Sequence, residues 1–234
     1  MMAITAAAAL SSIGGFAFSA ICGAVLFHLA IDPIQAVEIM MLCSVANQTA
    51  MVWALRQVID WCGLAVFLIG GAFGLPLGIW LLLHADRGLY THALGAFLLL
   101  YGAYMLLRRP LVMRWHHPSI DIGVGIVGGI TGGAVGFPGA FVTIWCSMKG
   151  WDKDRQRALF QPFILIMQVA ALLTLSLVHG THSGHGVDLG DLLCVPGSLL
   201  GTAAGLLCYR ALSDVHFARA INLLLIISGA SYLL

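Results

Sequence analysis

The chain has 234 residues, of which 60% are hydrophobic and only 9% are charged, and its mean hydropathy is +0.98. These values exclude a soluble globular domain and predict an all-α polytopic protein in a lipid bilayer. The formal net charge of +1, without a basic cluster, argues against a nucleic-acid partner.

The apolar segments follow one another with short loops, and most are close to the roughly 20 residues that a membrane-spanning helix needs. They cover residues of about 3–30, 35–55, 62–84, 89–107, 120–147, 158–178, 189–209 and 214–234. We therefore predict a single membrane domain over residues 1–234. No Lys or Arg precedes Arg56, so the basic region of a signal peptide is missing and the N-terminus is interpreted as mature structure.

The first segment is interrupted by Gly14 and Gly15, followed by Phe16, and we predict that it enters and leaves the membrane from outside. Asn47 and Gln48, together with Thr49, form the most polar cluster inside the second segment. Their amides can donate hydrogen bonds to an anion, although such residues also bond between membrane helices.

Glu38 is the one carboxylate that the pattern places within hydrocarbon. An acid in that position can carry a proton that couples transport. Because Glu38 follows Asp32 by only six residues, a solvated position at the interface is the alternative that the sequence favours.

The most unusual stretch is GVGIVGGITGGAVGFPG, residues 123–139, in which eight of seventeen residues are glycine. Interior glycines each cost a helix roughly 0.5–1 kcal/mol relative to alanine. Backbone amides without partners are costly in hydrocarbon, so the chain cannot simply unfold there. A broken helix that lines a protected polar cavity satisfies both conditions.

Both flanks of this stretch are basic, with Arg108, Arg109 and Arg114 before it and Lys149, Lys153, Arg155 and Arg157 after it. Short cytoplasmic loops collect Lys and Arg, so we place both flanks inside and predict a re-entrant hairpin of two half-helices. With this topology only Arg87, of eleven Lys and Arg, falls in an outer loop.

The same topology divides the chain into two halves of about 1–110 and 115–234. Each half is predicted to be a glycine-broken re-entrant element followed by three transmembrane helices. Three crossings are an odd number, so the second repeat is inverted relative to the first and both termini face outward. Inverted repeats with broken helices are typical of secondary transporters, which bind substrate where the breaks meet.

We predict that the half-helix after the second break begins near Pro138, because proline suits a first helical turn. The amides and the positive dipole end of such a half-helix attract anions. The predicted substrate-binding residues are Gly14, Gly15, Phe16, Asn47, Gln48, Gly133, Gly136, Phe137, Pro138, Gly139 and Gln161. Two glycine sets also have the four-residue spacing of close helix packing, and both roles can coexist. These sets are Gly125, Gly129 and Gly133, and Gly128, Gly132 and Gly136.

The helix expected at 158–178 carries Gln161 and Gln168 as polar positions, with Pro162 as a residue that can disturb it. Beyond it, His179, His182 and His185 fall in a predicted outer loop. Their spacing would suit a divalent metal ion in a helix, but the intervening glycines and serine favour a flexible loop. The six cysteines lie in apolar segments and are interpreted as buried hydrophobic residues. We predict no metal site and no cofactor.

The stretch GGITGGAVGFPGAFVTIWCSMKGWDKDRQRALFQPF, residues 128–163, resembles the sulfite exporter TauE/SafE family. The matching features are a turn with Gly136, Pro138 and Gly139, a polar loop over 149–154, and the pair Arg157 and Ala158. Phe137 departs from the family pattern, which usually has a second turn glycine at that place.

The first half looks like a degenerate copy of the second, with SIGGFAFSAICGAV for the turn and Asp32, Pro33 and Ala36 at the following loop and helix start. Its turn lacks the proline. We expect these two departures from the pattern to affect the choice of substrate.

The resemblance implies a bacterial inner-membrane secondary transporter, and not an enzyme. Its substrate would be a small anion such as sulfite, an organosulfonate or a carboxylate, exported by alternating access. An anion channel of the same fold is the alternative, followed by a membrane metal-handling protein that uses the histidine loop. No P-loop, HExxH or Ser/His/Asp spacing indicates an enzyme. The sequence does not specify the transported anion, the direction of transport or the coupling ion. It is compatible with a homo-oligomer.

Overall fold

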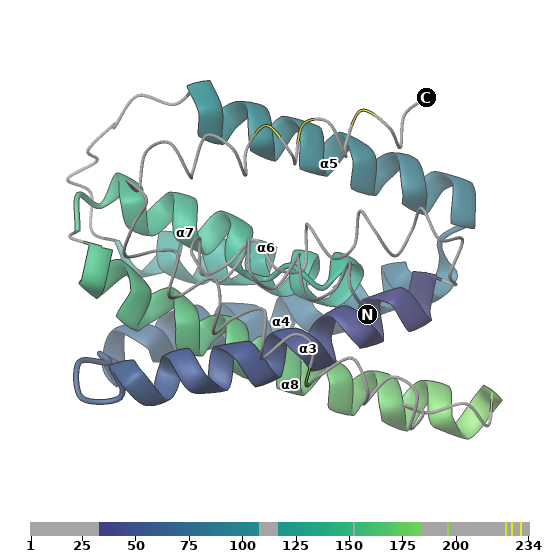
Figure 1. Cartoon of the computed structure of the whole chain (residues 1–234), viewed down its shortest axis with the longest axis horizontal. Helices are drawn as coiled ribbons and strands as arrows, with labels where there is room; N and C mark the ends of the chain where they lie inside the picture. Colours follow the sequence, from purple (N-terminus) through teal and green to yellow (C-terminus); the bar gives the residue numbers. More distant parts are fainter. Residues whose placement is uncertain are drawn as a thin grey trace. The chain divides into compact units, whose positions relative to one another are not determined.

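The computed structural model describes residues 33–107, 117–151 and 153–183, together with a few isolated positions nearer the C-terminus. Within these ranges the regular structure is helical and no strand occurs (Figure 1). The helices are α3 (Pro33–Leu55), α4 (Trp61–His84), α5 (Arg87–Leu107), α6 (Pro118–Val135), α7 (Gly139–Met148) and α8 (Lys153–Ser183). They confirm the predicted segments from residue 35 to 178. The segments predicted at 3–30, 189–209 and 214–234 lie outside the described residues, and so do Gly14, Gly15 and Phe16.

The chain divides into two compact units. One contains residues 1–43, 84–108 and 187–234, and its described part includes the start of α3 and α5. The other contains residues 44–83 and 109–186, which hold the rest of α3, nearly all of α4, and α6, α7 and α8. The glycine-rich segment belongs to this second unit, which is the one described below. The two inverted repeats stay a prediction.

By length and composition, Trp61–His84, Pro118–Val135 and Asp154–Val178 can each cross a membrane. On α4, Trp61 and Trp80 are 59% and 54% exposed and lie about 28 Å apart along the helix axis. Tryptophan favours the two interfaces of a bilayer, whose hydrocarbon core is about 30 Å thick. The large apolar side chains that are exposed between them, Ile69, Phe73 and Leu77, share one face of α4, so this face suits contact with lipid.

A neighbouring face of α4 packs against α6 through glycines. A Cβ atom added at Gly74 would overlap the carbonyl oxygen of Ile126, and one added at Gly129 would overlap that of Gly71. The backbones are therefore in direct contact. The glycines of this interface repeat at every fourth residue: Gly70, Gly74 and Gly78 on α4, and Gly125, Gly129 and Gly133 on α6. This confirms the packing interpretation of the α6 set, whereas its α4 partners were not singled out from the sequence.

The second glycine set of α6 faces the break and α8. A Cβ atom at Gly132 would lie 2.9 Å from Cβ of Pro138, and one at Gly128 would lie 3.1 Å from both Phe163 Cε1 and the Pro138 carbonyl oxygen. Phe163 is fully buried on α8. The small residues thus bring α6, α8 and the break into one packed core.

Helix α8 is longer than the sequence predicted, and it is continuous through Pro162. A proline inside a helix removes one backbone hydrogen bond, but the buried side chains around it, such as Leu159 and Phe163, hold the helix in place. At its C-terminal end α8 reaches Ser183 and includes the backbone of His179 and His182. The prediction that these two histidines lie in a loop is therefore wrong, while His185 lies outside the described residues.

Candidate functional site

The glycine-rich segment forms two helices with a break between them. Helix α6 ends at Val135, and Gly136 adopts the left-handed conformation with φ 68° and ψ 18°. Glycine adopts this conformation without steric cost. The N–H of Gly136 donates to the Gly132 carbonyl oxygen at 3.0 Å, and that of Phe137 donates to the Thr131 carbonyl oxygen at 3.2 Å. Pro138 then directly precedes α7 as its N-cap. The break predicted from glycine and proline is confirmed at these residues.

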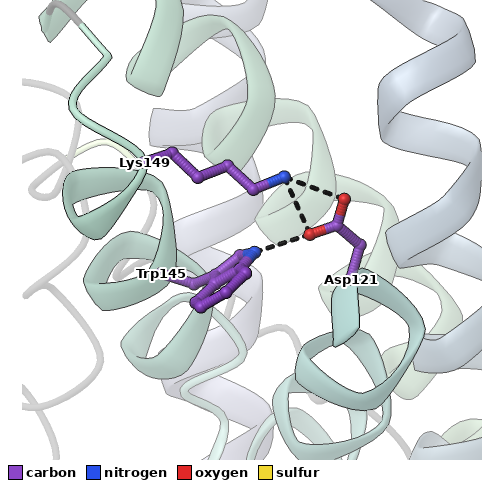
Figure 2. Close-up of polar contacts among 3 residues, drawn as sticks. All are labelled: Asp121, Trp145 and Lys149. Carbon is purple, nitrogen blue, oxygen red and sulfur yellow. Dashed lines mark hydrogen bonds and ion pairs between the residues drawn. The ribbon is translucent and has the colours of Figure 1, made fainter. Parts of the chain in front are cut away.

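The far ends of α6 and α7 meet. Asp121 lies in the first turn of α6, and Lys149 directly follows α7. Lys149 Nζ lies 2.8 Å from each oxygen of the Asp121 carboxylate, and Trp145 Nε1 donates to Oδ1 at 2.5 Å (Figure 2). The two helices are therefore antiparallel, with both ends of the glycine-rich segment on the same side of the hairpin.

The break itself is buried, as are all four residues from Gly136 to Gly139. The first turn of an α-helix carries N–H groups that make no hydrogen bond within the helix. In α7 this turn begins with Gly139 and Ala140, two buried residues that place at most one methyl group beside these N–H groups. Thr143 is also buried, but its hydroxyl donates to the carbonyl oxygens of Gly139 and Ala140 at 2.8 and 2.9 Å.

Helix α8 contributes amides to the same region. Gln161 and Gln168 are each 1% exposed, and their spacing of seven residues puts them on one face of the helix. Gln168 Nε2 donates to the carbonyl oxygen of Gly136 at 3.3 Å. Gln168 is not among the site residues predicted from the sequence, but its side-chain amide contacts the break. Gln161 lies two turns away on the same face.

The other predicted site residues have different positions. Gly133 lies at the α4 interface, where an added Cβ would come within 2.7 Å of Ile79 N and the Leu75 carbonyl oxygen. Asn47 and Gln48 are buried on α3, in the same unit as the break. Glu38 is only 6% exposed, so the expectation of a solvated carboxylate is wrong. It belongs to the other unit.

The basic flanks predict that Lys149 lies in an inner loop, but they do not predict its buried surroundings. Its side chain is 5% exposed and that of Asp121 is 16% exposed. The ammonium lies over the rings of Trp151, Phe67 and Trp145, at 4.9, 5.5 and 5.6 Å from their centroids. Aromatic faces attract cations, so the rings and the carboxylate together compensate for the loss of water. The available signal was that Asp121 is the only charge between Arg114 and Lys149.

The cysteines follow the prediction in part. Cys43 and Cys146 are buried, but Cys62 is exposed, contrary to expectation. Cys22, Cys194 and Cys208 lie outside the described residues. Within the part of the chain that the structure describes, no group of three or more His, Cys, Asp or Glu side chains could hold a metal ion.

Comparison with known protein families gives a match. The model of a family described as sulfite exporter TauE/SafE matches residues 1–232, which include the break, the hairpin and α8. Searches of curated proteins and of solved structures give no significant match.

Proposed function

The chain belongs to the sulfite exporter TauE/SafE family, a family of membrane transporters for sulfite and related sulfur anions, and we propose that it is a secondary transporter that exports such an anion by alternating access. It is a multi-pass membrane protein, and we place it in the bacterial inner membrane. Sulfite and organosulfonates are the proposed substrates, with small carboxylates as a further class.

One observation carries this proposal: the buried helix break at Gly136–Pro138. The N-terminal end of α7 carries a partial positive charge and amide N–H groups, which suit an anion. The glycines on both sides of Phe137 and Pro138 allow close approach to the backbone, and the Gln168 amide lies beside the break. Recognition by neutral donors avoids burying a cation whose charge would have to be compensated when the site is empty.

We propose, from the predicted inverted repeat, that the first-half break, Gly14 to Phe16, supplies a second half-helix; these residues lie outside those that the structure describes. The antiparallel arrangement of α6 and α7 supports a re-entrant second element, since both of its ends lie together. Two inward-facing half-helices then point their amides at one anion from opposite sides of the membrane. In this arrangement Glu38, a buried carboxylate, is the candidate for proton coupling.

The topology can be tested by cysteine labelling. His117 and Asp154 are exposed and flank the α6–α7 hairpin, so His117→Cys and Asp154→Cys are expected to react from the cytoplasmic side only. Gly88→Cys is the matched control, because Gly88 is exposed in the predicted outer loop and a Cβ there meets no atom within 4 Å. Each variant is made in a background without native cysteines and treated with an impermeant maleimide in intact cells and in inverted vesicles. Labelling of positions 117 and 154 from opposite sides would contradict the re-entrant element.

Transport can be tested with purified protein in liposomes. A carrier is expected to take up radiolabelled sulfite with saturation, and to do so faster when unlabelled sulfite is present on the other side. ATP should have no effect. Uptake that stays proportional to concentration and is not accelerated by internal sulfite would favour the channel.

The amides of α3 provide a residue-level test in the same assay. Asn47→Ala and Gln48→Ala are expected to raise the KM for sulfite about tenfold or more, because a hydrogen bond to a charged group contributes about 1.5–3 kcal/mol. Thr49→Ala is the control, since Thr49 is exposed on the same helix and bonds to the Val45 carbonyl oxygen. A wild-type KM in both amide variants would assign these residues to helix packing.

A further inference from the structure

The cluster of Asp121, Trp145 and Lys149, which we term the hairpin clasp, joins the two ends of the α6–α7 hairpin opposite the break. Three hydrogen-bond or ion-pair contacts hold the clasp together, and all of them end on the Asp121 carboxylate (Figure 2). The clasp is not part of the proposed anion site. Buried charge in a membrane helix is costly, so a role for the clasp is expected.

Lys149 is poorly suited to bind an anion directly. Its ammonium is enclosed by the carboxylate and by the faces of three aromatic rings. Ring faces carry negative electrostatic potential, so the carboxylate and the three rings all attract a cation and repel an anion. The charge of Lys149 therefore stabilises contacts within the protein and does not serve to bind the substrate anion.

The clasp has a mechanical consequence for the break. Helix α7 has only 10 residues and is joined to α6 through Gly136, whose left-handed conformation is available mainly to glycine. The direction of a short helix after such a break depends on its packing against α6 and α8 and on what holds its other end. That other end is Lys149, held to α6 by Asp121.

We propose that Asp121, Trp145 and Lys149 are positioning residues that fix the direction of α7, and through it the amides at Gly139 and Ala140. This role rests on the proposed function of the break as the anion site. When the clasp is broken, the α7 amides no longer converge on one point and anion affinity falls.

The first test measures the hairpin without any substrate. Cys146 is fully buried on α7, next to Trp145, and serves as a native reporter. In a variant whose only cysteine is Cys146, Lys149→Met is expected to raise the rate of maleimide labelling about tenfold or more, since it leaves a buried carboxylate without its partner. Arg155→Met is the matched control: it removes the same charge from a side chain that stacks on Trp151, outside the clasp. A variant that retains only the exposed Cys62 reports the maximal labelling rate.

The second test measures the KM for sulfite. Lys149→Met is expected to raise this KM about tenfold or more. The double variant Asp121→Asn with Lys149→Met is expected to have a KM between that of Lys149→Met and that of the wild type. The double variant contains no uncompensated charge, and Trp145 can still donate to Asn at position 121. If Lys149 were an anion ligand, the double variant would bind sulfite no better than Lys149→Met alone.

The outcomes separate the two proposals. If the wild-type protein does not transport or bind sulfite, the proposed function fails, whereas Cys146 labelling still decides whether the clasp holds the hairpin. Unchanged labelling in Lys149→Met, or a double variant no better than the single one, overturns the positioning role. If Lys149→Met does not fold, Trp145→Phe removes only the indole donor, and a rise of a few fold in both labelling and KM is expected. No change in either would overturn the role as well.

Discussion

Replacing Gly129 by alanine is expected to prevent stable folding of this protein, although only one methyl group is added. The new Cβ would overlap the carbonyl oxygen of Gly71 and lie 2.9 Å from the backbone nitrogen of Leu75. Backbone atoms of a helix cannot rotate aside, so α4 and α6 would have to separate along their whole interface. Overpacking a core with side-chain atoms lowers the free energy of unfolding by about 1–3 kcal/mol. A collision between backbones is expected to lower it by more. Thermal unfolding in detergent, followed by size-exclusion chromatography, measures the effect.

Gly123→Ala is the matched control on the same helix. An added Cβ at Gly123 meets no atom within 4 Å, and alanine favours a helix over glycine by about 0.5–1 kcal/mol. This variant should therefore unfold at the wild-type temperature or slightly above it. Equal unfolding temperatures for the Gly129 and Gly123 variants would show that the interface tolerates separation.

Gly136→Val is expected to abolish sulfite binding while the protein still inserts into the membrane. At φ 68° a residue other than glycine lowers the stability of this conformation by about 1–2 kcal/mol. A β-branched side chain lowers it further, because its rotamers are restricted. The branched side chain would also block approach to the backbone at the break. Binding can be measured by calorimetry on the purified variant, with its amount in the membrane as the check on insertion.

Gly136→Asn separates the two causes. Asparagine tolerates the left-handed conformation better than other non-glycine residues, so this variant should keep the shape of the break. It is expected to bind sulfite more weakly than the wild type but measurably. If asparagine abolishes binding as fully as valine, close approach to the backbone is the decisive requirement. Wild-type affinity in the valine variant would move the anion site away from Gly136.

Local patterns predicted much of the fold and the break. Apolar length gave the helices from α3 to α8, glycine and proline together placed the break, and the basic flanks on both sides predicted that the hairpin returns to its starting side. These signals are local because they depend on backbone preference and on the contrast between hydrocarbon and water.

Other features depend on how helices meet, and the sequence did not predict them. Asp121 and Lys149 are 28 residues apart, and their pairing follows from the lengths of α6 and α7 and the turn between them. The burial of Glu38 depends likewise on tertiary packing. Helix α8 begins at Lys153, before its apolar stretch, because a helix continues into water when its residues favour it, whereas hydropathy marks only the part in hydrocarbon.

The contact between α4 and α6 limits which parts of the protein can move during transport. Because glycines repeat every four residues on both helices, sliding one along the other would first push Cα atoms against carbonyl oxygens and side chains. The next matching position lies a full repeat away, about 6 Å along the axis. Rocking is resisted as well, since backbones in contact leave no compressible side chains between them. We therefore expect α4 and α6 to move as one rigid body. The conformational changes of a transport cycle then occur where this helix pair contacts other helices.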